Sequence, residues 1–172
     1  MIRRRSLLAA CLALAAAPAA AASPWDALGR PGTHAIMRHA LAPGTGDPPA
    51  FRIGDCATQR NLDARGRAQA RAIGAAIREA GVSFDRVLTS QWCRCRETAE
   101  LLDVGPVEDF PALNSFFADR STRDAQTAAV RDFLAALPEG ERVMLVTHQV
   151  NITALTGRGV SSGEVFAIEP RA

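Results

Sequence analysis

Arginine and histidine side chains stand at or just beyond the ends of three apolar segments of this sequence. Arg38 and His39 follow the first segment, Arg94 comes shortly after the second, and His148 follows the third. Guanidinium groups match phosphate oxygens in geometry as well as in charge. Neighbouring cations lower the pKa of an imidazole, and a neutral imidazole can attack phosphorus to form a phosphohistidine. These residue types therefore predict phosphoryl chemistry.

Apolar segments that end so abruptly are typical of buried strands, and segments with helical spacing lie between them. Strands are expected at 33–37, 86–90, 107–110, 142–147 and 165–168, and helices at 63–81, 93–102, 124–137 and 151–155. This alternation predicts a three-layer α/β/α sandwich with a mainly parallel central sheet. Ligands bind beyond the carboxyl ends of such strands, so the arginines and histidines should meet at one sheet edge. The Gly- and Pro-rich segment 42–49 should form a loop at its rim.

Four segments, in order, resemble the motifs of the histidine phosphatase superfamily, branch 1, whose members have a phosphoglycerate-mutase-like fold. They span roughly residues 33–156. The segments are Arg38-His39-Ala40 (Arg-His-Gly in the family), 61–70 (Leu-Thr-x-x-Gly-x-x-Gln-Ala), 89–99 (Ser-Ser-Pro-x-x-Arg-Ala-x-x-Thr-Ala) and 146–149 (Thr-His-Gly).

The resemblance implies that His39 is the nucleophile of a metal-independent phosphomonoesterase that needs no cofactor. Arg38, Arg94 and His148 would hold the phosphoryl group of a small phosphorylated substrate. Arg94 falls on the family's arginine when the following Thr-Ala pair is aligned. Gln149 replaces a family glycine, where it would narrow the pocket or add an amide donor to the substrate.

The family's carboxylic acid has no direct counterpart here. It should fall near residues 113–115, which contain no acid, and the nearest candidates are Glu108, Asp109 and Asp119. We favour Asp119 as the acid of the catalytic set, because it follows that segment on the loop side. The missing acid also motivates an alternative of another class, a phosphate- or phosphoglycan-binding module without turnover. A partner protein with a vestigial pocket is a third reading.

The first 22 residues have the pattern of an export signal. Three arginines (residues 3–5) precede an apolar run and small residues, and cleavage after Ala22 would leave a single domain at 23–172. The run is interrupted by Pro18, so no membrane span is expected to remain. Removal of residues 1–22 changes the formal charge from +2 to −1, which excludes nucleic-acid binding as the main function. The expected location is periplasmic or secreted, and an envelope sugar phosphate is the substrate suggested by that address.

Three cysteines remain after the predicted cleavage: Cys56, Cys93 and Cys95. On a helix, Cys93 and Cys95 point away from each other, so they cannot bind one metal ion together, and no zinc-type spacing exists. A bridge from Cys56 to one of them would tie the long excursion after the first strand to the helix that carries Arg94. We favour Cys93 as the partner, because Cys95 replaces a small buried alanine of the family. Three separate thiols are the alternative.

Overall fold

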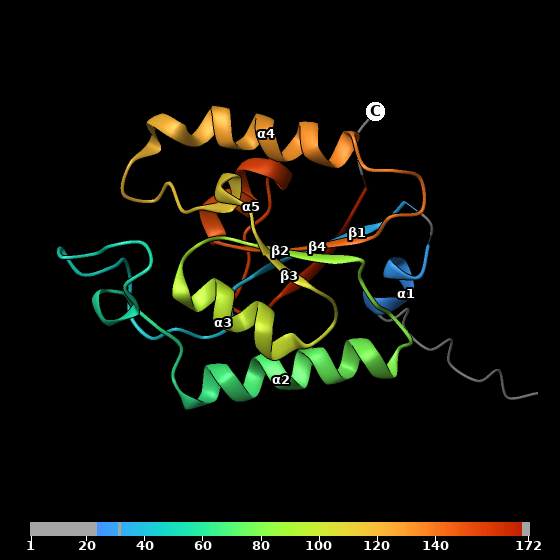
Figure 1. Ribbon diagram of the computed structural model, residues 1–172, viewed down its shortest axis with the longest axis horizontal. Helices are drawn as coiled ribbons and strands as arrows, with labels where there is room; N and C mark the ends of the chain where they lie inside the picture. Colours follow the sequence, from blue (N-terminus) through green and yellow to red (C-terminus); the bar gives the residue numbers. More distant parts are fainter. Residues whose placement is uncertain (1–23, 31, 170–172) are drawn as a thin grey trace, which may run out of the picture.

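The computed structural model describes residues 24–30 and 32–169 of the 172-residue chain, and the predicted export signal at 1–22 lies outside them. A five-stranded sheet separates two layers of helices (Figure 1). The strands are β1 (His34–Arg38), β2 (Arg86–Thr89), β3 (Val107–Asp109), β4 (Val143–Thr147) and β5 (Val165–Ile168). Their order is β3-β2-β4-β1-β5, with β1 to β4 parallel and β5 antiparallel. The predicted α/β/α sandwich with a mainly parallel sheet is confirmed.

Helices α2 (Ala64–Glu79) and α3 (Cys93–Leu102) cover one face of the sheet, at the bottom of Figure 1. The Asp63 side chain caps α2 by accepting a hydrogen bond from the Gly66 amide at 2.8 Å. The two helices approach closely at Gly74, where a Cβ atom would lie 1.9 Å from the Leu102 carbonyl oxygen. Only glycine fits between the two backbones at this point.

Helices α4 (Arg123–Ala135) and α5 (Gln149–Thr156) cover the opposite face. Val130, Leu134 and Ile152 from these helices pack in one apolar cluster with Ile36 and Leu145 from the sheet. Because both faces of β1 and β4 are covered, these strands are apolar almost throughout, as parallel strands in this class of fold are. No helix in the described part of the chain is long and apolar enough to cross a membrane.

Helices α2 and α4 differ from the predicted ranges by one or two residues at each end. The last helix begins at Gln149 rather than at residue 151, with His148 as its N-cap residue. A five-residue helix, α1 (Pro24–Leu28), contacts β5 and was not predicted. It is too short for apolar spacing to reveal it, so the contact that holds it is tertiary.

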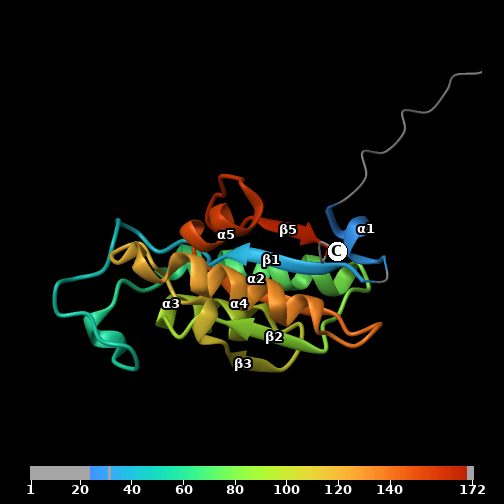
Figure 2. The same ribbon diagram turned by 90° about the horizontal axis from the view of Figure 1, so that it is seen from above.

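The carboxyl ends of β1, β2 and β4 lie at one edge of the sheet. Figure 2 shows β1 and β2 pointing toward the same side of the molecule, where the excursion of residues 40–62 extends beyond the sheet. The strand register places Arg38 beside Thr147 and Thr89 beside Val146. The residues that follow these strands therefore meet at this edge.

Candidate active site

His39 is the first residue after β1, and only 1% of its surface is exposed. Its Nδ1 lies 2.7 Å from the Ala40 carbonyl oxygen, to which it donates. The lone pair is therefore on Nε2, which accepts a hydrogen bond from Arg94 Nε at 3.2 Å. Burial, followed by the positive charges of Arg94 and Arg38, lowers the pKa of His39 to about 3. His39 thus presents a neutral imidazole at the cavity wall, and its Nε2 electron pair is held by the hydrogen bond from Arg94.

His148 stands at the end of β4, and its ring centroid lies 5.5 Å from that of His39. Its Nδ1 lies 3.4 Å from Arg94 Nη2, and its Nε2 lies 2.9 Å from Ser90 Oγ. Since arginine only donates, Nδ1 accepts and the ring proton stays on Nε2. Burial lowers the pKa of His148 well below its ordinary value, and Arg94 adds to the effect. The site therefore holds two neutral imidazoles.

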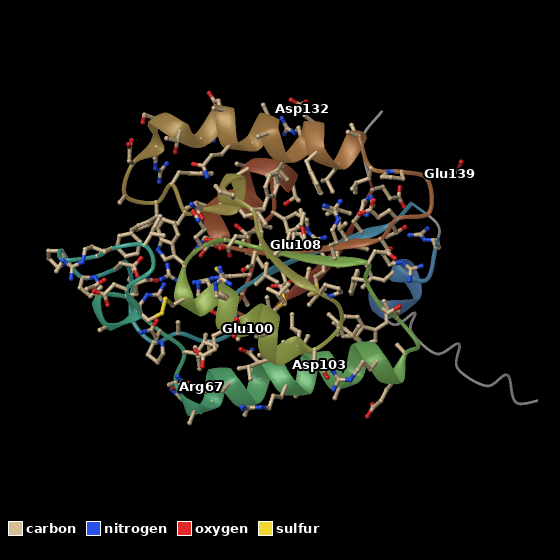
Figure 3. All side chains as sticks on the ribbon, viewed as in Figure 1. Arg67, Glu100, Asp103, Glu108, Asp132 and Glu139 are labelled. Atoms are coloured by element: carbon tan, nitrogen blue, oxygen red, sulfur yellow. A yellow bond between two sulfur atoms is a disulfide. The ribbon has the colours of Figure 1, made fainter. Side chains whose placement is uncertain are left out.

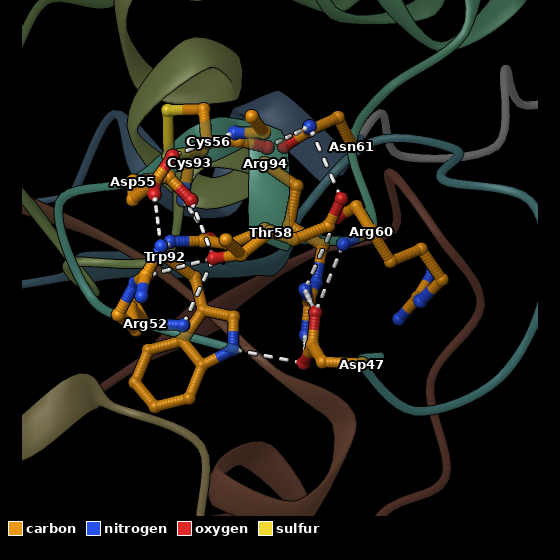
Figure 4. Close-up of a disulfide and its surroundings, with 12 residues drawn as sticks. Asp47, Arg52, Asp55, Cys56, Thr58, Arg60, Asn61, Trp92, Cys93 and Arg94 are labelled. Carbon is orange, nitrogen blue, oxygen red and sulfur yellow. Dashed lines mark hydrogen bonds and ion pairs between the residues drawn. A yellow bond between two sulfur atoms is a disulfide. The ribbon is translucent and has the colours of Figure 1, made fainter. Parts of the chain in front are cut away.

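Arg94 joins these groups from the first turn of α3, with 3% of its surface exposed. Nε donates to His39, and Nη2 donates to His148. The Asp47 carboxylate accepts from Nη1 at 2.7 Å and from Nη2 at 3.2 Å, while the Arg60 carbonyl accepts from Nη1 at 3.2 Å (Figure 4). These five contacts match the five N–H groups of a guanidinium. All donors of Arg94 are thus engaged by protein acceptors.

Arg38 and Arg60 are two further cations of the cavity wall. Arg38 donates from Nη1 to the Val160 carbonyl at 3.2 Å, while its Nε is buried and has no hydrogen-bond partner within the described ranges. A buried donor without a partner is costly unless a ligand satisfies it. Arg60 donates from Nε to the Gly46 carbonyl at 2.7 Å and from Nη1 to the Ala42 carbonyl. Arg60 therefore anchors the rim loop and also borders the cavity.

Asp47 is the functional residue that sequence reasoning missed. It belongs to the rim loop at 42–49, and among the described residues it is the only carboxylate that lines the cavity. Besides Arg94, its oxygens accept from Trp92 Nε1 at 3.0 Å and from the Arg60 amide at 3.1 Å. Burial would raise the pKa of Asp47, but the hydrogen bonds from Arg94 and Trp92 outweigh it and lower the pKa. The only signal in the sequence was an acid within a Gly- and Pro-rich loop after the first strand.

The expected acid, Asp119, does not lie in the cavity. Its exposed carboxylate accepts from the Ser121 amide at 2.9 Å and caps the short 3-10 turn of residues 120–122. Glu108, labelled in Figure 3, lies on the edge strand β3 and faces Arg86 at 3.8 Å. Asp109 on the same strand pairs with Arg96. None of the three acids considered from sequence reaches the reaction centre.

The other predicted site residues do converge. The cavity wall contains Arg38, His39, Arg94, His148 and Gln149. The cavity wall also contains Gly44, Thr45 and Gly46, so the segment 42–49 lies at the rim as predicted.

A disulfide joins Cys56 to Cys93, as preferred from sequence, and Cys95 is free and buried. Cys93 is the first residue of α3, so the bond connects the excursion directly to the turn that carries Arg94 (Figure 4). Burial raises the pKa of Cys95 to about 12, which keeps it a thiol. The disulfide therefore fastens the excursion that supplies Asp47 and Arg60.

The sequence profile of the histidine phosphatase superfamily (branch 1) matches residues 35–117, a segment that contains Arg38, His39 and Arg94. This segment belongs to the histidine phosphatase superfamily. No curated protein matches the chain at a significant level.

Solved structures with the fold of this superfamily resemble the chain over most of its length. The first is described as a phosphohistidine phosphatase, SixA, from Agrobacterium tumefaciens, with 20% identity, 81% of this chain and 92% of that chain covered, and a TM-score of 0.59. The mycobacterial glucosyl-3-phosphoglycerate phosphatase Rv2419c has 16% identity, coverages of 77% and 88%, and a TM-score of 0.54. The α-ribazole phosphatase from Shigella flexneri has 22% identity, coverages of 80% and 94%, and a TM-score of 0.51. At these identities the likeness establishes the phosphoglycerate-mutase-like fold.

Proposed function

We propose that this protein is a metal-independent phosphomonoesterase that works through a phosphohistidine on His39. The observation that carries the proposal is the neutral imidazole of His39, which lines a cavity with Arg38 and Arg94 and whose Nε2 accepts a hydrogen bond from Arg94. When the phosphoryl group takes over the Arg94 Nε–H, the Nε2 electron pair is released. Nε2 then attacks phosphorus, and the bond from phosphorus to the ester oxygen breaks. Water then attacks the phosphorus of the phosphohistidine, the N–P bond breaks, and inorganic phosphate and free His39 result. The arginines stabilise the charge of the transferring group, and His148 closes the other side of the site.

Asp47 is the proton donor in this proposal, in place of Asp119. A phosphate dianion competes with the Asp47 carboxylate for Arg94, because both are oxyanions that bind the same N–H groups. Once displaced, the carboxylate lies near the bound dianion, which favours its protonated form. Asp47 then gives its proton to the departing ester oxygen and takes one from water in the second step.

The binding module without turnover is the second candidate. The observation that favours it is the occupation of all five Arg94 donors by protein groups, since a ligand must displace Asp47 before it gains this arginine. A vestigial pocket in a partner protein would bind no phosphate at all. Neither of these two proteins would hydrolyse a phosphate ester. The binding module would bind phosphate, whereas the partner protein would not.

We also propose that residues 1–22 are an export signal and that the domain at 23–172 acts in the periplasm or outside the cell. The Cys56–Cys93 disulfide supports this location, because such bonds persist in oxidising compartments. The proposed substrate is a small phosphorylated molecule, for which an envelope sugar phosphate suits the location.

The proposal is tested by assaying the purified protein with p-nitrophenyl phosphate in the presence of EDTA. Wild-type protein should release p-nitrophenol, and His39→Ala should abolish release while still binding inorganic phosphate in calorimetry. Arg96→Ala is the matched control, because Arg96 lies on the same helix but pairs with Asp109 outside the cavity. Phosphate binding without turnover would instead establish the binding module.

A further inference from the structure

The cavity extends well beyond the reaction centre. Its volume is about 540 Å³, within the range of roughly 300–1,000 Å³ that small-molecule sites occupy. His39, His148 and their arginines line one part of it. The lining also includes Ser115, Phe116 and the half-exposed Phe117, two further arginines, Arg120 and Arg123, and residues of α5. A substrate that fills the cavity therefore contacts a second cationic wall.

The charges of the lining residues do not balance. The described lining contains five arginines and one acid, Asp47, which is already bound to Arg94. The closest carboxylate to Arg123 is that of Asp124 at 3.9 Å, and Asp124 is 97% exposed, so this pair is weak. Within the part of the chain that the structure describes, Arg120 has no acidic partner within 4.0 Å. Two guanidiniums of the far wall are thus available to an anion.

The helix that carries Arg123 is held against the residues that precede Ser115. Gln126 on α4 donates from Nε2 to the carbonyls of Asn114 at 2.8 Å and Ala112 at 3.1 Å. Asn114 in turn accepts hydrogen bonds from Ser90 Oγ and the Gln91 amide, next to His148. The first turns of α4, which carry Arg123, are therefore tied through Asn114 to the residues around the reaction centre.

We propose that Arg120 and Arg123 bind a second phosphate group of the substrate, so that the preferred substrates are bisphosphorylated small molecules. Two guanidiniums carry the two charges that a phosphate dianion needs, and each can form paired hydrogen bonds with its oxygens. A single carboxylate would leave one charge unmatched. The half-exposed Phe117 offers the scaffold of such a substrate an apolar surface in the same cavity. This inference rests on the proposed function, since it assigns the substrate class of the same site.

The test compares glucose 1,6-bisphosphate with glucose 6-phosphate as substrates. In wild-type protein, kcat/KM should favour the bisphosphate by about tenfold or more, and the double variant Arg120→Gln/Arg123→Gln should remove that preference, mainly through KM. Arg131→Gln is the control, because Arg131 lies on α4 outside this cavity, and the preference should persist. Equal preference in wild type and double variant would overturn the subsite.

A binding measurement separates this inference from the enzymatic proposal. His39→Ala protein should bind glucose 1,6-bisphosphate more tightly than glucose 6-phosphate in calorimetry, and adding the two Arg→Gln changes should abolish the difference. If this pattern holds while no substrate is hydrolysed by wild type, the phosphatase proposal fails and the subsite stands. If p-nitrophenyl phosphate is hydrolysed but neither protein distinguishes the two sugars, the subsite fails alone.

Discussion

The Cys56–Cys93 disulfide closes a loop of the chain over a sequence separation of 37 residues. This loop contains Arg60 and the whole of α2. In the chain-entropy treatment, closing a loop of this length in the unfolded state stabilises the fold by about 4 kcal/mol at 25 °C. The 3-10 turn at 56–58 buries no residue, so packing there adds little of its own. The double variant Cys56→Ala/Cys93→Ala should therefore lose about 4 kcal/mol of unfolding free energy.

Urea unfolding of oxidised wild type and of the double variant measures this loss. Wild type treated with dithiothreitol should shift toward the variant, whereas the variant itself should not respond to the reductant, because Cys95 has no partner to release. Thiol titration of the denatured, unreduced domain at 23–172, which lacks Cys11, should find one free thiol. A loss below about 1 kcal/mol would refute the loop-entropy reasoning, and three free thiols would refute the bond itself.

Three further predictions concern the site and its support. Asp47→Asn should reduce hydrolysis of glucose 6-phosphate by about 100-fold, and that of p-nitrophenyl phosphate much less, because the nitrophenolate leaves without a proton. Asp119→Asn is the control and should change either rate by less than about twofold. If Asp47→Asn slowed the hydrolysis of both substrates equally, Asp47 would not be the proton donor. The lowered pKa of His39 means that the unfolded chain, but not the folded one, binds a proton there at pH 5, so stability falls as pH falls. Between about pH 6 and pH 5, the unfolding free energy of His39→Gln should fall by about 1 kcal/mol less than that of wild type. Urea unfolding at the two pH values measures this difference, and an equal fall in both proteins would contradict the buried neutral imidazole. Gly74→Ala should lower the thermal midpoint by several degrees, since its Cβ would meet the Leu102 carbonyl; an unchanged midpoint in calorimetry would show that α2 moves freely.

The reaction centre could be predicted from the sequence because its side chains follow strands directly. The order of a parallel sheet brings the residues after β1, β2 and β4 to one edge whatever the loops do. Arg94 could be distinguished from Arg96 through Thr98, four residues later on the same helix. In the structure, the Thr98 hydroxyl accepts from the Ala40 amide at 3.0 Å and so ties α3 to the end of β1.

The positions of Asp47 and Asp119 relative to the cavity could not be predicted in this way. Both lie in segments without strand or helix periodicity, where the direction of a side chain depends on contacts distant in sequence. Asp47 turns inward because Trp92 and Arg94 donate to it across 45 and 47 residues. Asp119 instead bonds to an amide two residues away. Asp119 was favoured because it follows the segment where the family's acid should fall, and position along the chain contains no information on such pairings.

Chemical trapping of the intermediate tests the central claim most directly. Wild-type protein mixed with 32P-labelled substrate and quenched in denaturing alkali should carry label that is stable in base, is released in acid, and maps to the peptide containing His39. His39→Ala should carry none, and Arg96→Ala should match wild type. Turnover of substrate with no base-stable label on His39, or with label on a serine or an aspartate, would contradict the phosphohistidine mechanism.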